Sequence, residues 1–272
     1  MLKSRLVVVT KYSKYGFFWY TSVDMKTTTP HGFLLVNKPA GISSFYVVKK
    51  IKQLIPTREK IGHAGTLDPL ASGLLIIGVG RTATRHLGQF MSLQKTYIAT
   101  GKLGEQTDSL DLEGTVIQTC SSAGIEPESI RSAVSSFPNK YFQVPPIYSA
   151  LKHEGVRLYH AARKQSKTVE ELEAIAEQKK RQVTLHNLHL TEINLPYFTI
   201  EATVSHGTYI RVLVNDIAKK VGSCATTYTL ARTAIGVFTL QKAHDFTTIT
   251  SLQALETMLI PVEKFLTILS AE

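Results

Sequence analysis

The sequence predicts an α+β fold, with a mixed, mostly antiparallel central sheet flanked by helices. Strand-like and helix-like segments follow one another without the regular strand–helix–strand period of a parallel sheet. No internal repeat is visible along the chain. The 272 residues, of which 43% are hydrophobic, are enough to bury the core of one large domain.

The first patterned segments are a strand and a helix. Residues 32–41, GFLLVNKPAG, predict a short apolar strand that enters a Pro-Gly turn. A helix capped by Ser43 or Ser44 follows, and Pro56 marks its end. The apolar positions of this helix form one stripe: Val47, Val48, Ile51, Leu54 and Ile55.

The middle of the chain alternates between the two kinds of element. LLIIGV, residues 74–79, predicts an apolar strand, and a helix is expected from about Thr82. Residues 95–104 and 114–120 are strand-like and flank the acidic loop QTDSLDLE. Apolar residues at helical spacing predict a further helix over 127–137.

The second half continues the same mixture. Residues 169–181 predict a charged, solvent-exposed helix, and 211–222 predict an amphipathic helix that ends at Gly222. Residues 198–205, FTIEATVS, alternate as a half-buried strand does. One face of that strand carries Phe198, Ile200, Ala202 and Val204.

The chain divides into three parts. Residues 1–24 are basic and aromatic, and they lack the unbroken apolar region and small-residue cleavage site of a signal peptide. Because Met25 precedes the first patterned strand, a mis-called start is one explanation of this extension. We take residues 25–240 as the main domain and 241–272 as its helical C-terminal tail.

The net charge and the cysteine count of the chain indicate which kinds of molecule and environment it is suited to. The net charge of +10 indicates a polyanion, with nucleic acid as the first candidate and a membrane surface as the second. The two cysteines, Cys120 and Cys224, argue against a disulfide scaffold and fit a reducing cytosol. No apolar run reaches the roughly 20 residues that a membrane-spanning helix needs.

The stretch GHAGTLDPLASG, residues 62–73, contains a single carboxylate, Asp68. Asp-Pro commonly starts a turn, and a structural turn is the ordinary interpretation of such a loop. Pro69, however, keeps Asp68 out of the helical region of backbone space. Between Gly65 and Gly73, the loop can therefore hold one short carboxylate rigidly toward a cleft, as a nucleophile requires.

A second stretch, SHGTYIRVLV at 205–214, adds an arginine and an aromatic hydroxyl. A strand ends at the glycine, and we expect Tyr209 and Arg211 to project on one side because they are two residues apart. A surface arginine at a strand end is the ordinary alternative. In this chain Arg211 can pair bidentately with Asp68, and Tyr97 adds another hydroxyl on a strand.

Other candidate sites are weaker. His186 and His189 lie three apart on a strand-like segment without a cluster of ligands, so no metal site is predicted. Asp108, Asp111 and Glu113 could bind a cation, although an exposed acidic turn explains them better. GVGRT, at 78–82, lacks the P-loop pattern and is better explained as a strand end followed by a helix.

Taken together, these stretches resemble those of the TruB-type tRNA pseudouridine synthases. The similar segments, in the family's order, are LLVNKPAGISS (34–44), GHAGTLDPLASGLLIIGVGRTATR (62–85), KTYIATGKLGEQTDSLDLEG (95–114), VPPIYSALKHEGVRLYHAARK (144–164) and SHGTYIRVLVNDIAKKVG with TLART (205–233). They cover most of residues 32–240. The resemblance implies a pseudouridine synthase fold with 25–240 as the catalytic domain.

The resemblance also implies roles for single residues. Asp68 matches the family's catalytic aspartate, Tyr97 its active-site tyrosine and Arg211 the arginine of its GTYIR motif. The expected substrate-binding residues are His63, on a loop that wedges into the RNA, together with Tyr97, Tyr209 and Leu230. Lys38 and Pro39 match a structural motif under the site, and the plausible phosphate contacts are Lys49, Lys50, Lys52, Arg81 and Arg85.

The chain departs from the family pattern in several places. Ala64 replaces a usual threonine, Ala231 a usual arginine and His206 a common lysine. After Leu240 the sequence continues only with ITSLQALETML and PVEKFLTIL, so we expect no C-terminal RNA-binding domain of the kind many bacterial relatives carry.

The resemblance implies an isomerase that converts uridine 55 in the T-loop of tRNA to pseudouridine. The base would be flipped into a pocket where Asp68 attacks either the ribose C1′ or the uracil C6. Asp68 or Tyr97 would take the C5 proton. The reaction neither adds nor removes atoms, so no cofactor and no metal are expected. The expected enzyme is a cytoplasmic monomer that binds the tRNA T-stem-loop and no membrane.

Two other functions remain open at this point. A glycosidase could use Asp68 against an anomeric carbon, but that chemistry needs a second, paired carboxylate that no motif displays. An RNA-binding or RNA-folding protein could use the same scaffold without catalysis.

Overall fold

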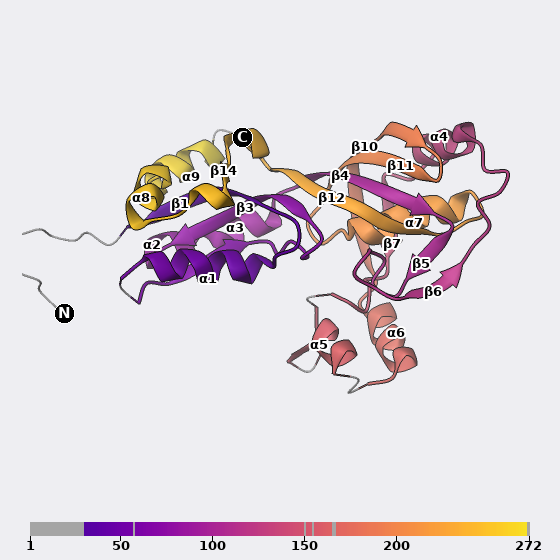
Figure 1. Cartoon of the computed structure of the whole chain (residues 1–272), viewed down its shortest axis with the longest axis horizontal. Coiled ribbons are helices and arrows are strands. Elements are labelled where there is room, and N and C mark those ends of the chain that lie inside the picture. The colour runs from indigo at the N-terminus through magenta and orange to yellow at the C-terminus, as the bar shows by residue number, and fades with distance from the viewer. Residues whose placement is uncertain (1–29, 57, 150, 154, 165–166, 271–272) are drawn as a thin grey trace, which may run out of the picture.

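A computed structural model describes residues 30–56, 58–149, 151–153, 155–164 and 167–270. At its centre lies a ten-stranded sheet in the order β14-β1-β3-β12-β4-β11-β10-β7, with β2 paired to β3 and β13 to β12 (Figure 1). The pairs β1–β14 and β3–β12 are parallel and the others antiparallel, which confirms the predicted class. The extension 1–24 discussed above lies outside the described residues.

The strands of the sheet are β1 (Gly32–Lys38), β2 (Ile61–Ala64), β3 (Ser72–Val79), β4 (Lys95–Leu103), β7 (Lys140–Gln143), β10 (Arg181–Asn194), β11 (Tyr197–Val204), β12 (Ala225–Ile235), β13 (Phe238–Thr239) and β14 (His244–Asp245). Two hairpins stand apart from it: β5 (Glu105–Thr107) with β6 (Val116–Thr119), and β8 (Lys152–His153) with β9 (Val156–Arg157). The helices are α1 (Ser44–Leu54), α2 (Arg81–Thr84), α3 (Leu87–Ser92), α4 (Pro127–Ser135), α5 (Leu158–Arg163), α6 (Val169–Gln178), α7 (Ile210–Lys220), α8 (Leu252–Met258) and α9 (Val262–Ser270).

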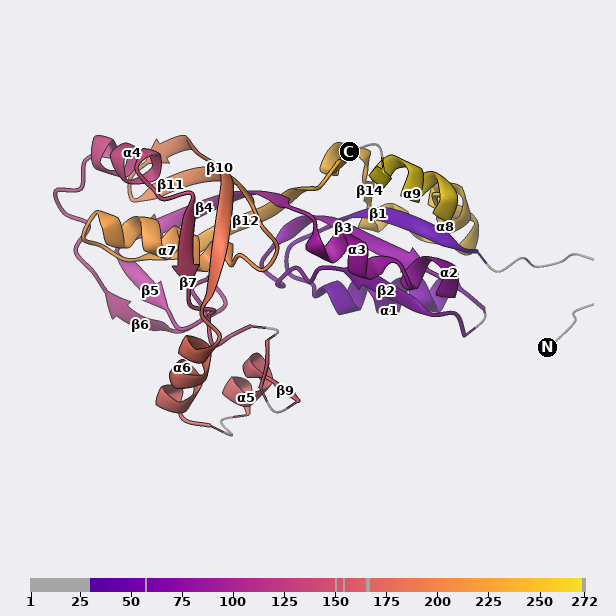
Figure 2. The same cartoon turned by 180° about the vertical axis from the view of Figure 1, so that it is seen from behind.

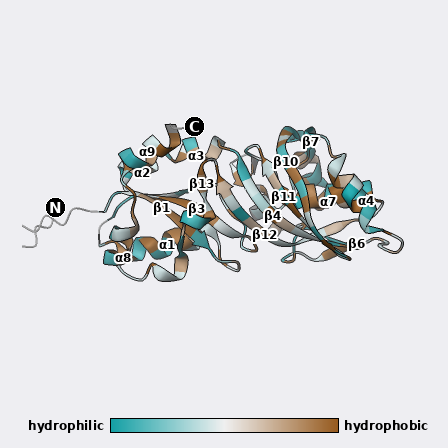
Figure 3. Cartoon of the chain, turned by 90° about the horizontal axis from the view of Figure 1, so that it is seen from above, coloured by the Kyte–Doolittle hydropathy of each residue, from teal (hydrophilic) through white to brown (hydrophobic). Residues whose placement is uncertain are grey.

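The half of the sheet around β1 and β3 is covered on both faces. On one face α1 and α8 contribute Val47, Ile51 and Leu255 to the core, and on the other α3 and α9 contribute Phe90 and Phe265 (Figure 3). A strand with helices on both sides is buried on both sides, so its sequence is apolar without alternation. This explains the continuous apolar run of β3.

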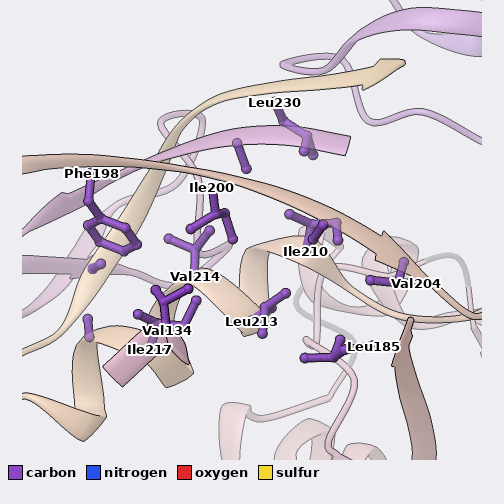
Figure 4. Packing of buried hydrophobic residues seen from close by; sticks show 14 of the residues in the cluster. Val134, Leu185, Phe198, Ile200, Val204, Ile210, Leu213, Val214, Ile217 and Leu230 are labelled. Atoms are coloured by element: carbon purple, nitrogen blue, oxygen red, sulfur yellow. The ribbon is translucent and has the colours of Figure 1, made fainter. Parts of the chain in front are cut away.

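The other half of the sheet is covered on one face only. There α4 and α7 pack on the side chains of β11 that point inward, and Figure 4 shows this cluster. The burial of β11 alternates residue by residue, and Phe198, Ile200, Ala202 and Val204 are buried as predicted. The alternation of buried and half-buried residues along β11 therefore reflects a sheet that is covered on one face only.

Most predicted helices form, with differences at their ends. The side chain of Ser43 caps α1 by accepting a hydrogen bond from the Tyr46 N–H. The helix expected from Thr82 is two short helices, α2 and α3. The helix expected over 169–181 ends at Gln178, and it is not wholly exposed, because Leu172 packs with Leu158 in a small core of its own. Figure 2 shows this appendage of α5 and α6 beside the sheet.

The two cysteines form a disulfide, although their small number had argued against a disulfide scaffold and for a reducing cytosol. Cys120 follows β6 and Cys224 precedes β12, 104 residues later. The backbone of Gly104 bonds to both cysteines, as a donor to Cys224 and an acceptor from Cys120. The pairing is a consequence of tertiary contacts that spacing does not encode. It ties the β5–β6 hairpin to the sheet.

The C-terminal segment packs on the β1 side of the sheet. Phe265 of α9 is fully buried, with its ring stacked 4.4 Å from that of Phe33 and 4.3 Å from that of Phe238. No helix among the described residues is long and apolar enough to cross a bilayer.

Candidate active site

Asp68 lies in the turn that connects β2 to β3, and neighbouring residues fix the backbone of this turn. Ser44, at the start of α1, accepts a hydrogen bond from the Leu67 N–H (2.8 Å) and donates one to the Leu67 carbonyl (3.0 Å). The turn closes with a bond from the Ala71 N–H to the Asp68 carbonyl. The Asp68 side chain remains 40% exposed, so the turn presents its carboxylate to solvent.

Arg232 of β12 joins both ends of the same turn. Its side chain is buried, and it donates from Nε to the Leu74 carbonyl (2.8 Å) and from Nη2 to the Gly65 carbonyl (3.0 Å). At Gly73 (φ +105°), a Cβ would lie 2.3 Å from the carbonyl oxygen of Arg232. A glycine is therefore required where β3 and β12 meet.

Lys38 supports the turn from below. It is fully buried, and its Nζ donates to the carbonyls of Pro39 (2.8 Å) and Ile42 (2.7 Å) and more weakly to that of Pro69 (3.5 Å). Burial lowers the pKa of Lys38 to about 8, and the negative charge of Asp68 opposes this shift. Lys38 thus connects the end of β1 to the turn that carries Asp68.

Arg211 lies in the first turn of α7 and is 96% buried, with 4% of its surface exposed. Its Nε lies 3.0 Å from Asp68 Oδ2, and its Nη1 lies 3.4 Å from Asp111 Oδ2. It also donates to the carbonyls of Ser109 and Tyr148. The expected bidentate pair with Asp68 is therefore wrong: the guanidinium is shared between two carboxylates and two carbonyls.

The acidic loop between β5 and β6 is not the exposed turn that we expected. Asp111 is buried, where it pairs with Arg211 and accepts bonds from the Ser109 hydroxyl (2.6 Å) and the Glu113 N–H (3.0 Å). Asp108 accepts a bond from the Tyr148 hydroxyl. The sequence did not identify Asp111 and Tyr148 as site residues. Both lie in segments that resemble the family, Asp111 in 95–114 and Tyr148 in 144–164, but their contact with Arg211 spans 63 to 100 residues of sequence.

Two cavities meet at Asp68. One, of about 510 Å³, is lined by Tyr97, Tyr209 and Leu230. The other, of about 700 Å³, is lined by aromatic and acidic side chains that include Phe45 and Asp111. Both cavities share the following residues: Thr66, Leu67, Asp68, Ser149 and Arg211. The Asp68 carboxylate can therefore reach a ligand in either cavity.

The structure brings most of the sequence-predicted residues together. Tyr97 of β4 and Leu230 of β12 line the smaller cavity with Asp68. Tyr209 lines it too, but not for the expected reason, since it is the N-cap residue of α7 and Arg211 is already helical. The spacing-of-two argument was wrong, because a helix begins between the two residues.

His63 has a different setting from the one we expected. It belongs to β2, paired opposite Ile77 of β3, rather than to a free loop. It lines the larger cavity, away from Tyr97. Strand pairing thus fixes its backbone, and the residue borders the larger cavity together with Asp68.

The remaining candidates lie outside the cavities. Lys49, Lys50 and Lys52 are exposed on α1, and Arg81 and Arg85 are exposed at α2. Within the described ranges, no group of three or more His, Cys, Asp or Glu side chains is arranged to hold a metal ion.

Comparison with known proteins gives consistent matches. Residues 52–210 match the TruB family pseudouridylate synthase (N terminal domain). The tRNA pseudouridine synthase B of Clostridium kluyveri is 39% identical over 235 residues, which are 86% of this chain and 77% of that protein. The tRNA pseudouridine synthase B of Protochlamydia amoebophila is 38% identical over 246 residues, 88% of this chain and 89% of that protein.

Solved structures share the fold at lower identity. A Cbf5-Nop10-Gar1 complex matches with a TM-score of 0.63 and 21% identity, covering 96% of this chain and 70% of that chain. An H/ACA RNP bound to a substrate RNA containing 2'-deoxyuridine matches with a TM-score of 0.61, 19% identity and the same coverage. At these identities the match concerns the fold alone.

Proposed function

The chain belongs to the TruB family of tRNA pseudouridine synthases, and we propose that it converts the T-loop uridine at position 55, with Asp68 as the nucleophile. Membership in this family makes it an isomerase that acts on tRNA uridine. The position within tRNA and the residue roles belong to the proposal.

One observation carries the proposal: of the carboxylates that line the two cavities described above, Asp68 is the one that lines both. Asp68 is 40% exposed, whereas the side chain of Asp111, the other carboxylate of the Arg211 pair, is 5% exposed. Asp68 is thus accessible to a substrate and held by a buried cation. A turn residue would need neither property.

The cavity on the Tyr97 side suits a flipped uracil. A Tyr ring and a Leu side chain provide flat apolar surface for the base, and aromatic stacking is a usual mode of single-stranded RNA recognition. The reaction breaks the N1–C1′ bond, turns the uracil and joins C5 to C1′. The attacking oxygen comes from Asp68, and Asp68 or Tyr97 accepts the proton that leaves C5.

Asp111 does not supply the second carboxylate that the glycosidase alternative needs. That chemistry requires a second carboxylic acid facing the substrate across the bond. Asp111 is buried, ion-paired with Arg211 and hydrogen-bonded to Ser109. It cannot act as the acid without breaking these contacts.

The proposed enzyme acts as a cytoplasmic monomer, without metal or cofactor, on the T-stem-loop of tRNA. The resemblance to the family supports the monomer, and the atom balance of the isomerisation supports the absence of a cofactor. The mass of the purified protein in solution, alone and with one T-stem-loop RNA, tests the stoichiometry.

Purified protein should be incubated with an unmodified T-stem-loop RNA and, as a control, with an anticodon stem-loop that also has uridines in its loop. We expect pseudouridine at position 55 of the first RNA and none in the second. Equal modification of both would refute the T-loop assignment. Binding of the T-stem-loop without isomerisation would instead support a non-catalytic RNA-binding protein.

A further inference from the structure

The last residue of β7, Gln143, makes contacts that the proposed reaction has not used. Its side chain is 2% exposed. Oε1 accepts a hydrogen bond from the Tyr209 N–H (2.7 Å), and Nε2 donates to the Tyr209 carbonyl (3.0 Å). The second Nε2 hydrogen is directed to the Tyr141 hydroxyl (2.6 Å). Both Nε2 hydrogens are therefore used, and the backbone N–H and carbonyl of Tyr209 fix which end of the side-chain amide is oxygen and which is nitrogen.

Tyr209 is the N-cap residue of α7, where first-turn N–H groups lack helical partners. A Ser, Thr, Asp or Asn at the N-cap commonly satisfies one of them, but the Tyr209 side chain makes no capping hydrogen bond. The Gln143 amide instead holds the N-cap backbone from the neighbouring strand. It fixes the position of the first turn of α7 from outside the helix.

That first turn carries Arg211, which contacts Asp68 at 3.0 Å. The segment that follows Gln143 returns to the same arginine, because the Tyr148 carbonyl accepts a bond from Arg211 Nη2 (2.9 Å). Two sets of hydrogen bonds thus connect the chain after β7 to the start of α7. One joins Gln143 to Tyr209, and the other joins Arg211 to Tyr148. A shift at Gln143 would be transmitted to the Arg211–Asp68 pair.

We propose that Gln143 is a positioning residue, which sets the Tyr209 ring and the Arg211 guanidinium against Asp68 for the reaction. This inference rests on the proposed role of Asp68 and Arg211. Gln143 itself lines neither of the two cavities, so it acts on the substrate through Tyr209 and Arg211. The role of the Gln143 amide is to hold Tyr209 and Arg211 in position.

A variant that keeps the volume and removes all three side-chain hydrogen bonds is Gln143→Met. We expect its kcat to fall about 10- to 100-fold, since misplacement by about 1 Å at a reacting centre can cost 100-fold. KM for T-stem-loop RNA should change less than about threefold, because phosphate contacts elsewhere determine most of the affinity. A merely structural role would lower thermal stability without this split between kcat and KM.

The matched control is Gln106→Met. Gln106 is a glutamine of β5 that accepts a bond from Asn215 in the middle of the same helix (2.8 Å). It ties α7 to the β5–β6 hairpin but not at the end that carries Arg211. We expect a loss of stability with kcat within about twofold of the wild type. Equal kcat losses in both variants would overturn the proposal.

Gln143→Glu tests the same point if Gln143→Met folds poorly. As a carboxylate it can accept from the Tyr209 N–H, but its second oxygen faces the Tyr209 carbonyl and repels it. Protonation restores a donor, so the kcat ratio of variant to wild type should rise as pH is lowered. The other titratable or charged groups near this site are Tyr141, Asp216 and Arg181; the wild type has them too, so the ratio cancels their titration. A ratio independent of pH would contradict the donor's role.

Asp68→Asn belongs in the same series, so that the two claims can fail separately. If Asp68→Asn turns over normally, the proposed function is wrong. If Asp68→Asn is inactive and Gln143→Met keeps kcat within twofold of the wild type, the positioning role of Gln143 is wrong and the proposed function stands.

Discussion

Arg211 connects more of the site than any other side chain described above. It is a buried cation with one exposed and one buried carboxylate as partners, and two carbonyls complete its shell. Lysine at this position would keep the charge but lose the planar fork that reaches several acceptors at once. The site therefore depends on the shape of the guanidinium as well as on its charge.

We expect Arg211→Lys to fold, with kcat reduced about 10- to 100-fold. Because Lys cannot contact Asp68 and Asp111 together, Asp111 should become an under-satisfied buried charge and thermal stability should fall. The control is Arg131→Lys, whose ion pair with Glu128 is solvent-exposed. Such a pair contributes at most about 1 kcal/mol. Steady-state kinetics with near-normal kcat for Arg211→Lys would argue that only its charge matters.

A second residue, Asp216 on α7, should produce a pH-dependent stability unrelated to catalysis. Burial raises the pKa of Asp216 from 3.8 to about 6, and nearby Lys219 partly opposes the shift. The folded state therefore holds this proton up to a higher pH than the unfolded state. The stability that the folded state gains from holding this proton is fully present below about pH 4 and is lost as the pH rises through 6.

Asp216→Asn removes this titration. We expect the variant to gain stability relative to the wild type as pH rises from 4 to 8, by up to about 3 kcal/mol. Urea denaturation of both proteins across this range measures the difference. A difference that stays constant with pH would show that Asp216 titrates normally in the folded state.

Among the elements, the junction of β3 with β12 positions the Asp68 turn. Gly73 has φ +105° and no space for a Cβ beside the backbone of Arg232. Gly124 has a similarly positive φ of +79° but nothing within 4 Å of its Cβ position. Comparing substitutions at the two glycines therefore distinguishes the cost of a positive φ from the cost of a steric clash.

Gly124→Ala should cost about 1 kcal/mol of unfolding free energy, the usual penalty of a left-handed conformation. Gly73→Ala should cost at least about 3 kcal/mol, because β3 and β12 must separate. It should also lower kcat, since Arg232 can no longer hold both ends of the turn. Equal costs in chemical denaturation of the two variants would show that the contact at Gly73 is unimportant.

Elements with clear hydrophobic periodicity could be predicted from the sequence, and others could not. The alternation of β11 agrees residue by residue with its burial, and the stripe of α1 agrees at Val47, Val48 and Ile51, because each element has a single covered face. β12 has no such pattern, since it is rich in threonine and alanine and buries Thr226, Thr227 and Arg232. Such a strand is defined by its partners β3 and β4, which periodicity does not reveal.

The same limit applies to the site. The motif around Asp68 was visible because its residues are contiguous. Tyr97 and Tyr209 were noted beside it as aromatic hydroxyls, and the resemblance added Leu230. Asp111 and Gln143 were not visible, because each acts on a partner at least 66 residues away. Only the folded chain shows that an acidic loop and a strand end meet at the start of α7.

At the scale of the whole molecule, β4 and β12 run between the doubly covered and the singly covered halves of the sheet (Figure 1). The exposed lysines of α1 follow Ser43 and Ser44, which line the larger cavity. We expect a substantial part of the tRNA affinity to come from contacts between these lysines and phosphates.

Substitution of Lys49, Lys50 and Lys52 by glutamine should weaken binding and reduce the slope of log affinity against log salt by about 2 to 3. The control removes the same number of charges elsewhere: Lys179, Lys219 and Lys220, which are exposed beyond α6 and at the end of α7. Its slope should stay close to that of the wild type. Equal slopes for the two triple variants would mean that the net charge of +10, and not the three lysines of α1, determines the affinity for tRNA.

The most direct test of the central claim is single-turnover pseudouridine formation by Asp68→Asn on unmodified T-stem-loop RNA carrying a C5 label. Asparagine keeps the shape and the local hydrogen bonds of the turn but has neither the charge nor the attacking oxygen. We predict a folded protein that binds this RNA about as tightly as the wild type, forms no detectable pseudouridine and releases no label. Near-normal turnover by Asp68→Asn would contradict the role of Asp68 and the assignment of the whole site.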